Sequence, residues 1–259
     1  MIRRGKHALP QRNISLERNI VNANTDQANE KPNVTAGVLK RLFQVFGSLL
    51  VVAAILFISS GDLGWVWAWV YIAMSVVLLT INAPVILPTA PELAVERSRI
   101  AENTKGWDRV AVMLIFISGA GIFLIAGLDE RFGWSPQLAT AIHLITLVAV
   151  ILAQAVFIWA MASNRFFAKT VRIQEERGHT VASSGPYRFV RHPGYAANIV
   201  TMLAVSLLLS SLWALIPATL CVLAFIIRTA LEDKTLQAEL NGYKDYAQQT
   251  RYRLLPGVW

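Results

Sequence analysis

Long apolar runs alternate with polar segments along most of the chain. Four of these runs cover about residues 42–60, 65–81, 110–127 and 138–162, and each is close to the roughly 20 residues that a helix needs to cross a bilayer. A fifth run, about 196–227, is too long for one ordinary span, and a Ser210-Ser211 pair lies near its middle. We interpret it as a helical hairpin that turns near Ser210, with one long tilted helix as the alternative. The pattern therefore predicts an all-α integral membrane protein of about six transmembrane helices, the last two forming a hairpin.

The composition supports a bilayer rather than water as the solvent for this chain. Of its 259 residues, 55% are hydrophobic and 15% are charged, whereas soluble domains carry about 25% charged residues. The net charge of +8 does not indicate nucleic-acid binding, because the basic residues lie in loops between apolar runs and form no aromatic-basic stripe. We expect them to contact membrane lipid headgroups. The single cysteine, Cys221, provides neither a disulfide nor a cysteine-based zinc site, and no His/Cys cluster predicts a metal.

The distribution of basic residues predicts the orientation of the spans. With six spans, 23 of the 24 lysines and arginines fall on one side, and only Arg131 falls on the other. The positive-inside rule then places both termini in the cytoplasm, in a multi-pass protein of the inner membrane if the source is bacterial. Five spans would put the final basic residues outside, which the rule disfavours.

The same pattern divides the chain into three parts. Residues 1–40 are polar without an apolar core and predict a disordered cytoplasmic tail. Residues 41–162 hold the first membrane helices, and residues 163–259 hold the last two helices with most of the polar motifs. The oligomeric state is left open.

Some residues within or beside the spans have a simple structural interpretation. His143 and Gln154 lie inside the fourth run, and we expect them to form hydrogen bonds between helices. Four tryptophans lie at the predicted outer ends of spans, where an aromatic belt is expected: Trp65, Trp67, Trp69 and Trp134.

Polar motifs concentrate near the C-terminal half. Residues 164–177 mix aromatic, aliphatic and basic side chains, which is typical of a short helix lying at headgroup level, and Gly178 would end it. The segment from Gly185 to Tyr195 then combines turn formers, arginines and a histidine at the start of the fifth run. Irregular backbone at membrane depth is tolerated only beside protein or a watery cavity. Glu232-Asp233 follows where the last span ends, and its interpretations are a ligand site or a solvated helix end that pairs with basic neighbours.

These motifs, in this order, resemble a known enzyme family. The segment Gly185–Tyr195, a membrane hairpin, Glu232-Asp233, a Gly-Tyr-x-x-Tyr pattern at Gly242 and a Leu-Pro-Gly at Leu255 are similar to the isoprenylcysteine carboxyl methyltransferase and phospholipid methyltransferase superfamily. The resemblance covers about residues 164–259, and the segment 94–109 also looks like bacterial members. Two positions depart from the family pattern: Ala197 replaces a glycine, and Asp233 replaces the second glutamate of a Glu-Glu pair.

The resemblance implies an enzyme that uses S-adenosylmethionine, with a cytoplasmic loop and a C-terminal helix over the cofactor site. The acceptor would be a lipid or a prenylcysteine that enters from the bilayer. The resemblance implies that the cofactor pocket is formed by Gly185, Tyr187, His192, Pro193, Tyr195, Glu232 and Asp233. We expect Arg191, His192 and Glu232 to be the catalytic residues and Arg228 to orient the substrate.

Several alternatives stay open from the sequence. Carboxyl O-methylation of the isoprenylcysteine type is the first interpretation, and phospholipid N-methylation is the second. An amine acceptor would need a base, for which His192 or Glu232 is the candidate. A sterol-type membrane reductase that uses NADPH shares a similar Gly-Pro-Tyr and Arg-His-Pro pattern, and a non-catalytic membrane scaffold is the last alternative.

Overall fold

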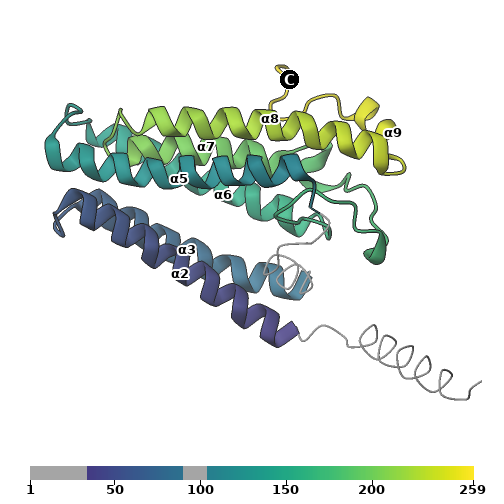
Figure 1. Ribbon diagram of the computed structural model, residues 1–259, viewed down its shortest axis with the longest axis horizontal. Coiled ribbons are helices and arrows are strands. Elements are labelled where there is room, and N and C mark those ends of the chain that lie inside the picture. Colours follow the sequence, from purple (N-terminus) through teal and green to yellow (C-terminus); the bar gives the residue numbers. More distant parts are fainter. Residues whose placement is uncertain (1–33, 90–103) are drawn as a thin grey trace, which may run out of the picture. The chain divides into compact units, whose positions relative to one another are not determined.

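The computed structural model describes residues 34–89 and 104–259, and every regular element within these ranges is a helix. The α-helices are α2 (Val34–Ser60), α3 (Val66–Thr89), α5 (Gly106–Phe132), α6 (Thr140–Ala162), α7 (Pro193–Leu208), α8 (Leu215–Glu239) and α9 (Tyr243–Gln249) (Figure 1). Two single turns of 3₁₀-helix, η1 (Glu175–Arg177) and η2 (Gly185–Arg188), lie between α6 and α7. Most of the predicted tail and of the segment 94–109 lies outside the described residues, and α2 begins inside the segment expected to be a tail.

The predicted apolar runs all form helices. Within residues 34–89 and 104–259, four helices are long and apolar enough to cross a membrane: α2 over Leu42–Ser60, α5, α6 and α8. Two shorter apolar helices, α3 over Val66–Asn82 and α7, complete the set. The structure thus confirms an all-helical protein with several apolar helices of membrane-spanning length. The number of six spans and the cytoplasmic placement of both termini stay predictions.

The fifth apolar run is a hairpin, so the single tilted helix is wrong. The helix breaks between Leu208 and Leu215, and Ser210 adopts the left-handed backbone conformation with φ of 60°. Asp129, in the last turn of α5, stabilises the turn at Ser210 through hydrogen bonds. Its buried carboxylate accepts hydrogen bonds from the Ser211 hydroxyl and from the backbone N–H and hydroxyl of Ser135. Such bonds offset the cost of withdrawing the carboxylate from water.

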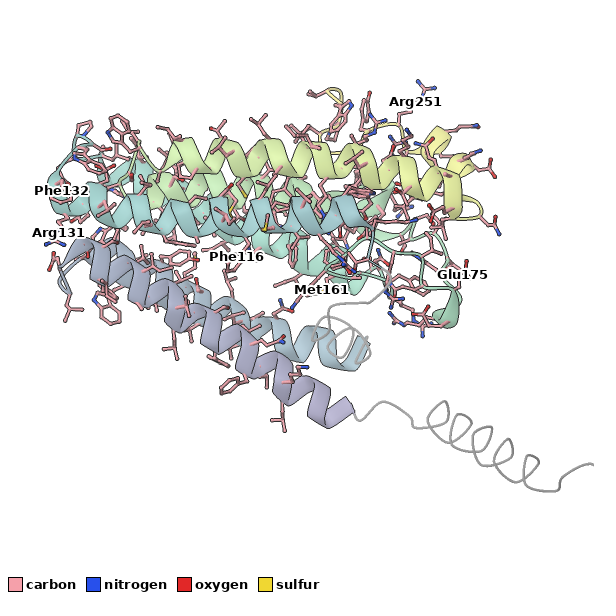
Figure 2. The ribbon with its side chains drawn as sticks, viewed as in Figure 1. Phe116, Arg131, Phe132, Met161, Glu175 and Arg251 are labelled. Atoms are coloured by element: carbon pink, nitrogen blue, oxygen red, sulfur yellow. The ribbon has the colours of Figure 1, made fainter. Side chains whose placement is uncertain are left out.

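Each apolar helix packs on its neighbours, antiparallel for α6 with α7, α7 with α8 and α5 with α8, and parallel for α2 with α5 and α3 with α6 (Figure 1). Alternating directions bring the starts of α5 and α7 to the same end as the finishes of α6 and α8. Arg131 lies at the opposite end of these helices from Glu175 and Arg251 (Figure 2). The polar segments of the C-terminal half therefore gather at one end of the apolar helices.

The polar residues inside α6 bond to α7, as the sequence predicts. His143 contacts the Leu208 carbonyl oxygen through Nδ1 at 3.0 Å and the Ser210 hydroxyl through Nε2 at 3.1 Å. The Gln154 side-chain amide donates to the Thr201 hydroxyl at 3.2 Å. These bonds fix the register of the two helices that carry the site, because an unpaired polar group in apolar surroundings is costly.

The aromatic-belt prediction is wrong for two of the four tryptophans. Trp65 is buried in a cluster with Leu56 and Ala68, and Trp67 stacks on the His143 ring at 3.9 Å between centroids. Trp69 and Trp134 are about half exposed, as belt residues would be. Trp65, which directly precedes α3, and Trp67, in its first turn, therefore pack between helices.

The close approach of α2 and α5 gives a test of this packing. A Cβ at Gly127 would meet the Ser59 hydroxyl and lie 2.9 Å from the Leu56 carbonyl oxygen, whereas a Cβ at Gly119 of the same helix meets nothing within 4 Å. We expect Gly127→Ala to destabilise the protein by about 1–3 kcal/mol through overpacking. Gly119→Ala is the control and should be neutral or slightly stabilising, since alanine favours helix. Thermal unfolding in detergent measures both, and equal midpoints would contradict the packing.

Candidate active site

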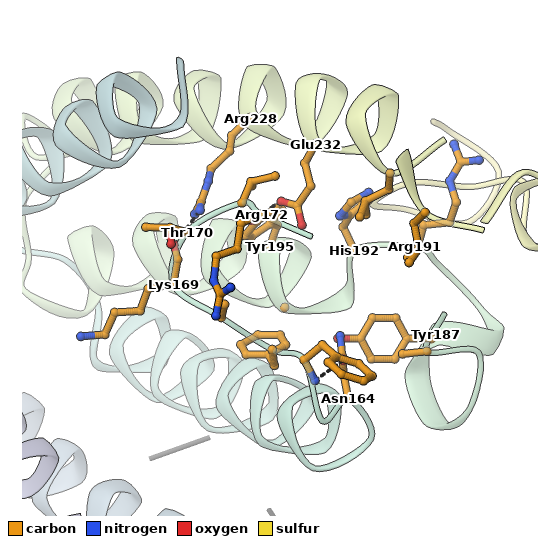
Figure 3. Close-up of a pocket in the computed structure, with 18 of the residues that line it drawn as sticks. Asn164, Lys169, Thr170, Arg172, Tyr187, Arg191, His192, Tyr195, Arg228 and Glu232 are labelled. Atoms are coloured by element: carbon orange, nitrogen blue, oxygen red, sulfur yellow. Dashed lines mark hydrogen bonds between the residues drawn. The ribbon is translucent and has the colours of Figure 1, made fainter. Parts of the chain in front are cut away.

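A cavity of about 370 Å³ lies at the end of the helices where the polar segments gather. Its wall is built from the first half of α5, the last turns of α6, the segment 163–192, the first turns of α7, the last turns of α8, and α9. Six of the predicted site residues line it (Figure 3): Tyr187, Arg191, His192, Tyr195, Arg228 and Glu232. Gly185, Pro193 and Asp233 are not among its lining residues. The structure thus brings two segments about 40 residues apart to one cavity.

Gly185 and Pro193 shape the wall through the backbone. Gly185 has φ of +58°, and a Cβ there would meet the Ser163 hydroxyl and come within 3.0 Å of the Trp159 ring nitrogen. The tight η2 turn places Tyr187, whose hydroxyl accepts a 3.2 Å hydrogen bond from the Asn164 side chain. Pro193 is the first residue of α7, where its missing N–H costs nothing. Burial raises the pKa of Tyr187, so its hydroxyl is neutral at the cavity wall.

Tyr195 and Glu232 join α7 to α8 across the cavity. The Tyr195 hydroxyl donates a 2.5 Å hydrogen bond to Glu232 Oε2. The Arg228 guanidinium lies 5.1 Å from the centre of the Tyr195 ring, a distance at which a cation is attracted to the ring face. Arg228 and Glu232 of α8 therefore both contact Tyr195 in the first turn of α7.

Arg228 is paired with an acid that the sequence argument did not select. Its Nε lies 2.7 Å from Asp108 Oδ1, and its Nη2 donates to the Lys169 carbonyl oxygen at 2.7 Å. Asp108 is fully buried in the first turn of α5 and also accepts the Val171 N–H at 2.7 Å. Breaking a buried ion pair by removing one partner costs about 3–5 kcal/mol. The pair therefore fastens the loop at residues 169–171 to both α5 and α8.

Asp233 is the centre of a second buried network. Its carboxylate accepts hydrogen bonds from Arg253 Nε at 3.0 Å, the Tyr243 hydroxyl at 3.0 Å and the Gln237 amide at 2.8 Å. Arg191 Nε lies 3.1 Å away as an ion pair without the alignment of a hydrogen bond, and His192 Nε2 lies at 3.5 Å. The side chain of Asp233 is fully buried and does not line the cavity. It contacts Arg191 and His192 on the side away from the cavity.

The segment at residues 252–253 completes this wall. The backbone N–H groups of Arg191 and His192 donate to the carbonyl oxygens of Tyr252 and Arg253, each at 2.9 Å. The Tyr246 hydroxyl of α9 donates to the Tyr187 carbonyl oxygen at 2.7 Å, and burial raises the pKa of Tyr246 to about 12. The C-terminal segment thus contacts the cavity wall through both its backbone and its side chains.

Residues 144–238 match the family model of the isoprenylcysteine carboxyl methyltransferase (ICMT) family. The match spans less than half of the chain, from α6 to the end of α8, and supports its resemblance to this superfamily. The chain is therefore an enzyme, a membrane methyltransferase. No curated protein matches the chain.

The ICMT-family match contains every predicted site residue, yet some residues that line the cavity or pair with its lining residues lie outside it. Asp108 precedes the matched residues, and Tyr243 and Arg253 follow them. Asp108 had a signal in the sequence: a carboxylate at the very start of an apolar run needs a cationic partner, and Arg228 ends another apolar run. The sequence held no such signal for Arg253, because its pairing with Asp233 depends on the path of the backbone in the last residues.

The loop 163–184 of this enzyme is not the predicted headgroup helix. Only Glu175–Arg177 forms a single 3₁₀ turn, which Gly178 ends in the left-handed conformation. The buried Gln174 side chain donates to the Phe166 carbonyl oxygen at 2.8 Å and accepts from Arg177, which replaces a helical bonding pattern. His179 Nδ1 accepts the Gln174 N–H at 3.3 Å. Burial, with nearby Arg172 and Arg177, lowers the pKa of His179 to about 4, so the ring is neutral at pH 7.

The Asp233 network predicts a large cost for a small substitution. We expect Asp233→Asn to destabilise the protein by about 3–5 kcal/mol, because two guanidinium groups would keep no charged partner there. Asp245→Asn, on the exposed side of α9, is the matched control and should change stability by less than about 0.5 kcal/mol. Thermal unfolding in detergent compares them. A variant Asp233→Asn as stable as the native protein would show that the network holds nothing together.

Proposed function

We propose that this enzyme transfers a methyl group from S-adenosylmethionine to the carboxylate of a membrane-embedded acceptor of the prenylcysteine type. The observation that carries the proposal is the charge of the cavity wall. Among the described residues that line it, four side chains are cationic and one, Glu232, is a carboxylate, and the cations are Lys169, Arg172, Arg191 and Arg228. Three of these cations are paired with Asp108, Asp233 and Glu176, and the groups that the wall presents to a ligand are still mainly cationic, which favours an anionic acceptor over a protonated amine.

The residues present fit the proposed cofactor. The volume of about 370 Å³ is within the range of about 300–1,000 Å³ that small-molecule sites have. Glu232 provides a carboxylate for hydroxyl or ammonium groups, and the rings of Tyr187 and Tyr195 provide apolar faces. When bound, S-adenosylmethionine supplies an electrophilic methyl group on a sulfonium. The residues of the chain then have to orient the acceptor and exclude water, since alignment carries much of the catalysis of a displacement.

In this proposal the predicted site residues divide into three groups. Tyr187, His192, Tyr195 and Glu232 form the cofactor wall directly, and Arg191, His192 and Glu232 are the candidate catalytic residues. Gly185, Pro193 and Asp233 contribute by fixing these side chains from behind. Arg228 faces the substrate side with its charge balanced by Asp108.

The chemistry of the acceptor favours O-methylation. A carboxylate is already ionised at pH 7 and needs no base, whereas an amine must first lose a proton. The neutral ring of His179 is no proton acceptor at Nδ1, because that atom already accepts the Gln174 N–H. Phospholipid N-methylation is therefore the second candidate, with His192 or Glu232 as the base. The ICMT-family match favours either over a reductase that uses NADPH.

The placement of the cavity supports a route for both substrates. It lies at the end of apolar helices, beside the loop 163–184 and α9. We propose that this end faces the cytoplasm, as the excess of basic residues indicates. The acceptor then enters from the bilayer and the cofactor from the aqueous side.

Labelled S-adenosylmethionine tests the reaction directly. The purified protein, incubated with labelled cofactor, total membrane lipid and prenylcysteine analogues, should place the label on the prenylcysteine as a base-labile methyl ester. Phosphatidylethanolamine should stay unlabelled. Label in an amine headgroup would contradict O-methylation, and binding of NADPH without binding of S-adenosylhomocysteine would contradict the whole proposal.

Two substitutions test the cofactor wall. His192→Ala and Glu232→Ala should each abolish binding of S-adenosylhomocysteine in calorimetric titration, because each removes a polar group from the cavity wall. Both variants should still fold. Glu175→Ala, an exposed carboxylate of the loop, is the control and should bind normally. Binding retained by both cavity variants would refute the site.

A further inference from the structure

The arginines that line the cavity differ in the carboxylates that hold them. Arg191 and Arg228 are paired with Asp233 and Asp108, whose side chains are both fully buried. Arg172 is also withdrawn from water, with 11% of its side chain exposed, yet its Nη1 pairs at 2.6 Å with Glu176, whose side chain is 57% exposed. The Glu176 carboxylate is therefore at the protein surface, whereas the Arg172 guanidinium is in the cavity wall.

This difference decides which arginine can exchange its partner. A carboxylate at the surface returns to water at little cost, and such pairs contribute little to stability. Separating Arg191 or Arg228 from a fully buried aspartate leaves an uncompensated charge inside the protein, which is strongly unfavourable. An anion that enters the cavity can therefore replace Glu176 at Arg172 far more easily than it can replace either aspartate.

The backbone around Arg172 is held firmly on both sides. Before it, the Lys169 carbonyl oxygen accepts from Arg228 and the Val171 N–H donates to Asp108. After it, the buried Gln174 side chain bonds to the Phe166 carbonyl oxygen. Figure 3 shows the Arg172 side chain among the drawn cavity residues, in the same region as Tyr195 and Lys169. A binding group held in place in this way loses little conformational freedom when its ligand arrives.

We propose that Arg172 is the carboxylate-binding residue of the cavity, and that Glu176 is its built-in competitor. The inference deepens the proposed function and rests on it for the choice of ligand. A planar guanidinium binds a carboxylate with two parallel hydrogen bonds, which also fixes its orientation. Two ligands of the proposed reaction carry a carboxylate: the prenylcysteine acceptor and the amino-acid end of the cofactor.

Paired ligands that differ only in the carboxylate distinguish these two sources. The acceptor pair is N-acetyl-S-farnesylcysteine and its carboxamide. The cofactor pair is S-adenosylhomocysteine and 5′-methylthioadenosine, which lacks the amino-acid end. Calorimetric titration of the full-length protein in lipid nanodiscs compares the native enzyme with Arg172→Gln, Arg172→Lys and Glu176→Gln. Glu175→Gln, at the neighbouring exposed position, is the matched control.

Arg172→Gln should weaken binding of the carboxylate member of one pair by about 10- to 100-fold and leave its carboxylate-free partner unchanged. The affected pair identifies the source. Glu176→Gln should tighten binding of that same ligand by up to about fivefold, because it removes the competitor. Arg172→Lys should recover part of the affinity. A merely structural ion pair predicts the opposite sign for Glu176→Gln.

Three results would overturn the inference. The first is equal loss for both members of a pair, or no loss at all, in Arg172→Gln. The second is weaker binding in Glu176→Gln. The third is a native protein that binds neither carboxylate ligand. A native protein that binds these ligands with the expected pattern but transfers no methyl group would sink the proposed function and leave the inference standing.

Discussion

Arg228 and Asp108 meet where two largely apolar helices reach the polar end of the protein, and both are withdrawn from water. A buried charge without its partner is strongly unfavourable, so the ion pair keeps the start of α5 against the last turns of α8. The same pair fixes the Lys169 carbonyl oxygen and the Val171 N–H. The irregular loop over the cavity is therefore anchored by an interaction between two helices rather than by regular structure of its own. The buried Asp233 carboxylate likewise anchors the part of the cavity wall that Arg191 and His192 form.

Much of the helical framework follows from the lengths of the apolar runs. The bilayer requires helices of a certain length, so the runs predict α2, α3, α5 and α6, and the excess length before Ile227 predicts the hairpin of α7 and α8. Hydropathy does not say which side of a helix faces another helix. The inward positions of Trp65 and Trp67 were missed for this reason.

The site was predictable as a set of motifs but not as a set of roles. The order of Gly185–Tyr195 and Glu232-Asp233 indicated a shared cavity, and six of the selected residues line it. The motif does not distinguish Glu232, which faces the cavity, from the adjacent Asp233, which points into the protein toward Arg253. Adjacent helical residues point about 100° apart, so only the packing of α8 tells them apart. The loop 163–184 escaped prediction because side-chain bonds from Gln174 replace its helical bonding.

The backbone bonds between residues 191–192 and 252–253 have a consequence for how the enzyme matures. A growing chain whose synthesis has reached residue 240 already contains α2 to α8, and these apolar helices are sufficient for insertion into a bilayer. It still lacks Tyr243, Tyr252 and Arg253, which close the wall around His192. Insertion of these helices therefore does not require the residues that complete the cavity wall. A chain of this length has the helices that a bilayer accepts, but its cavity wall is still incomplete.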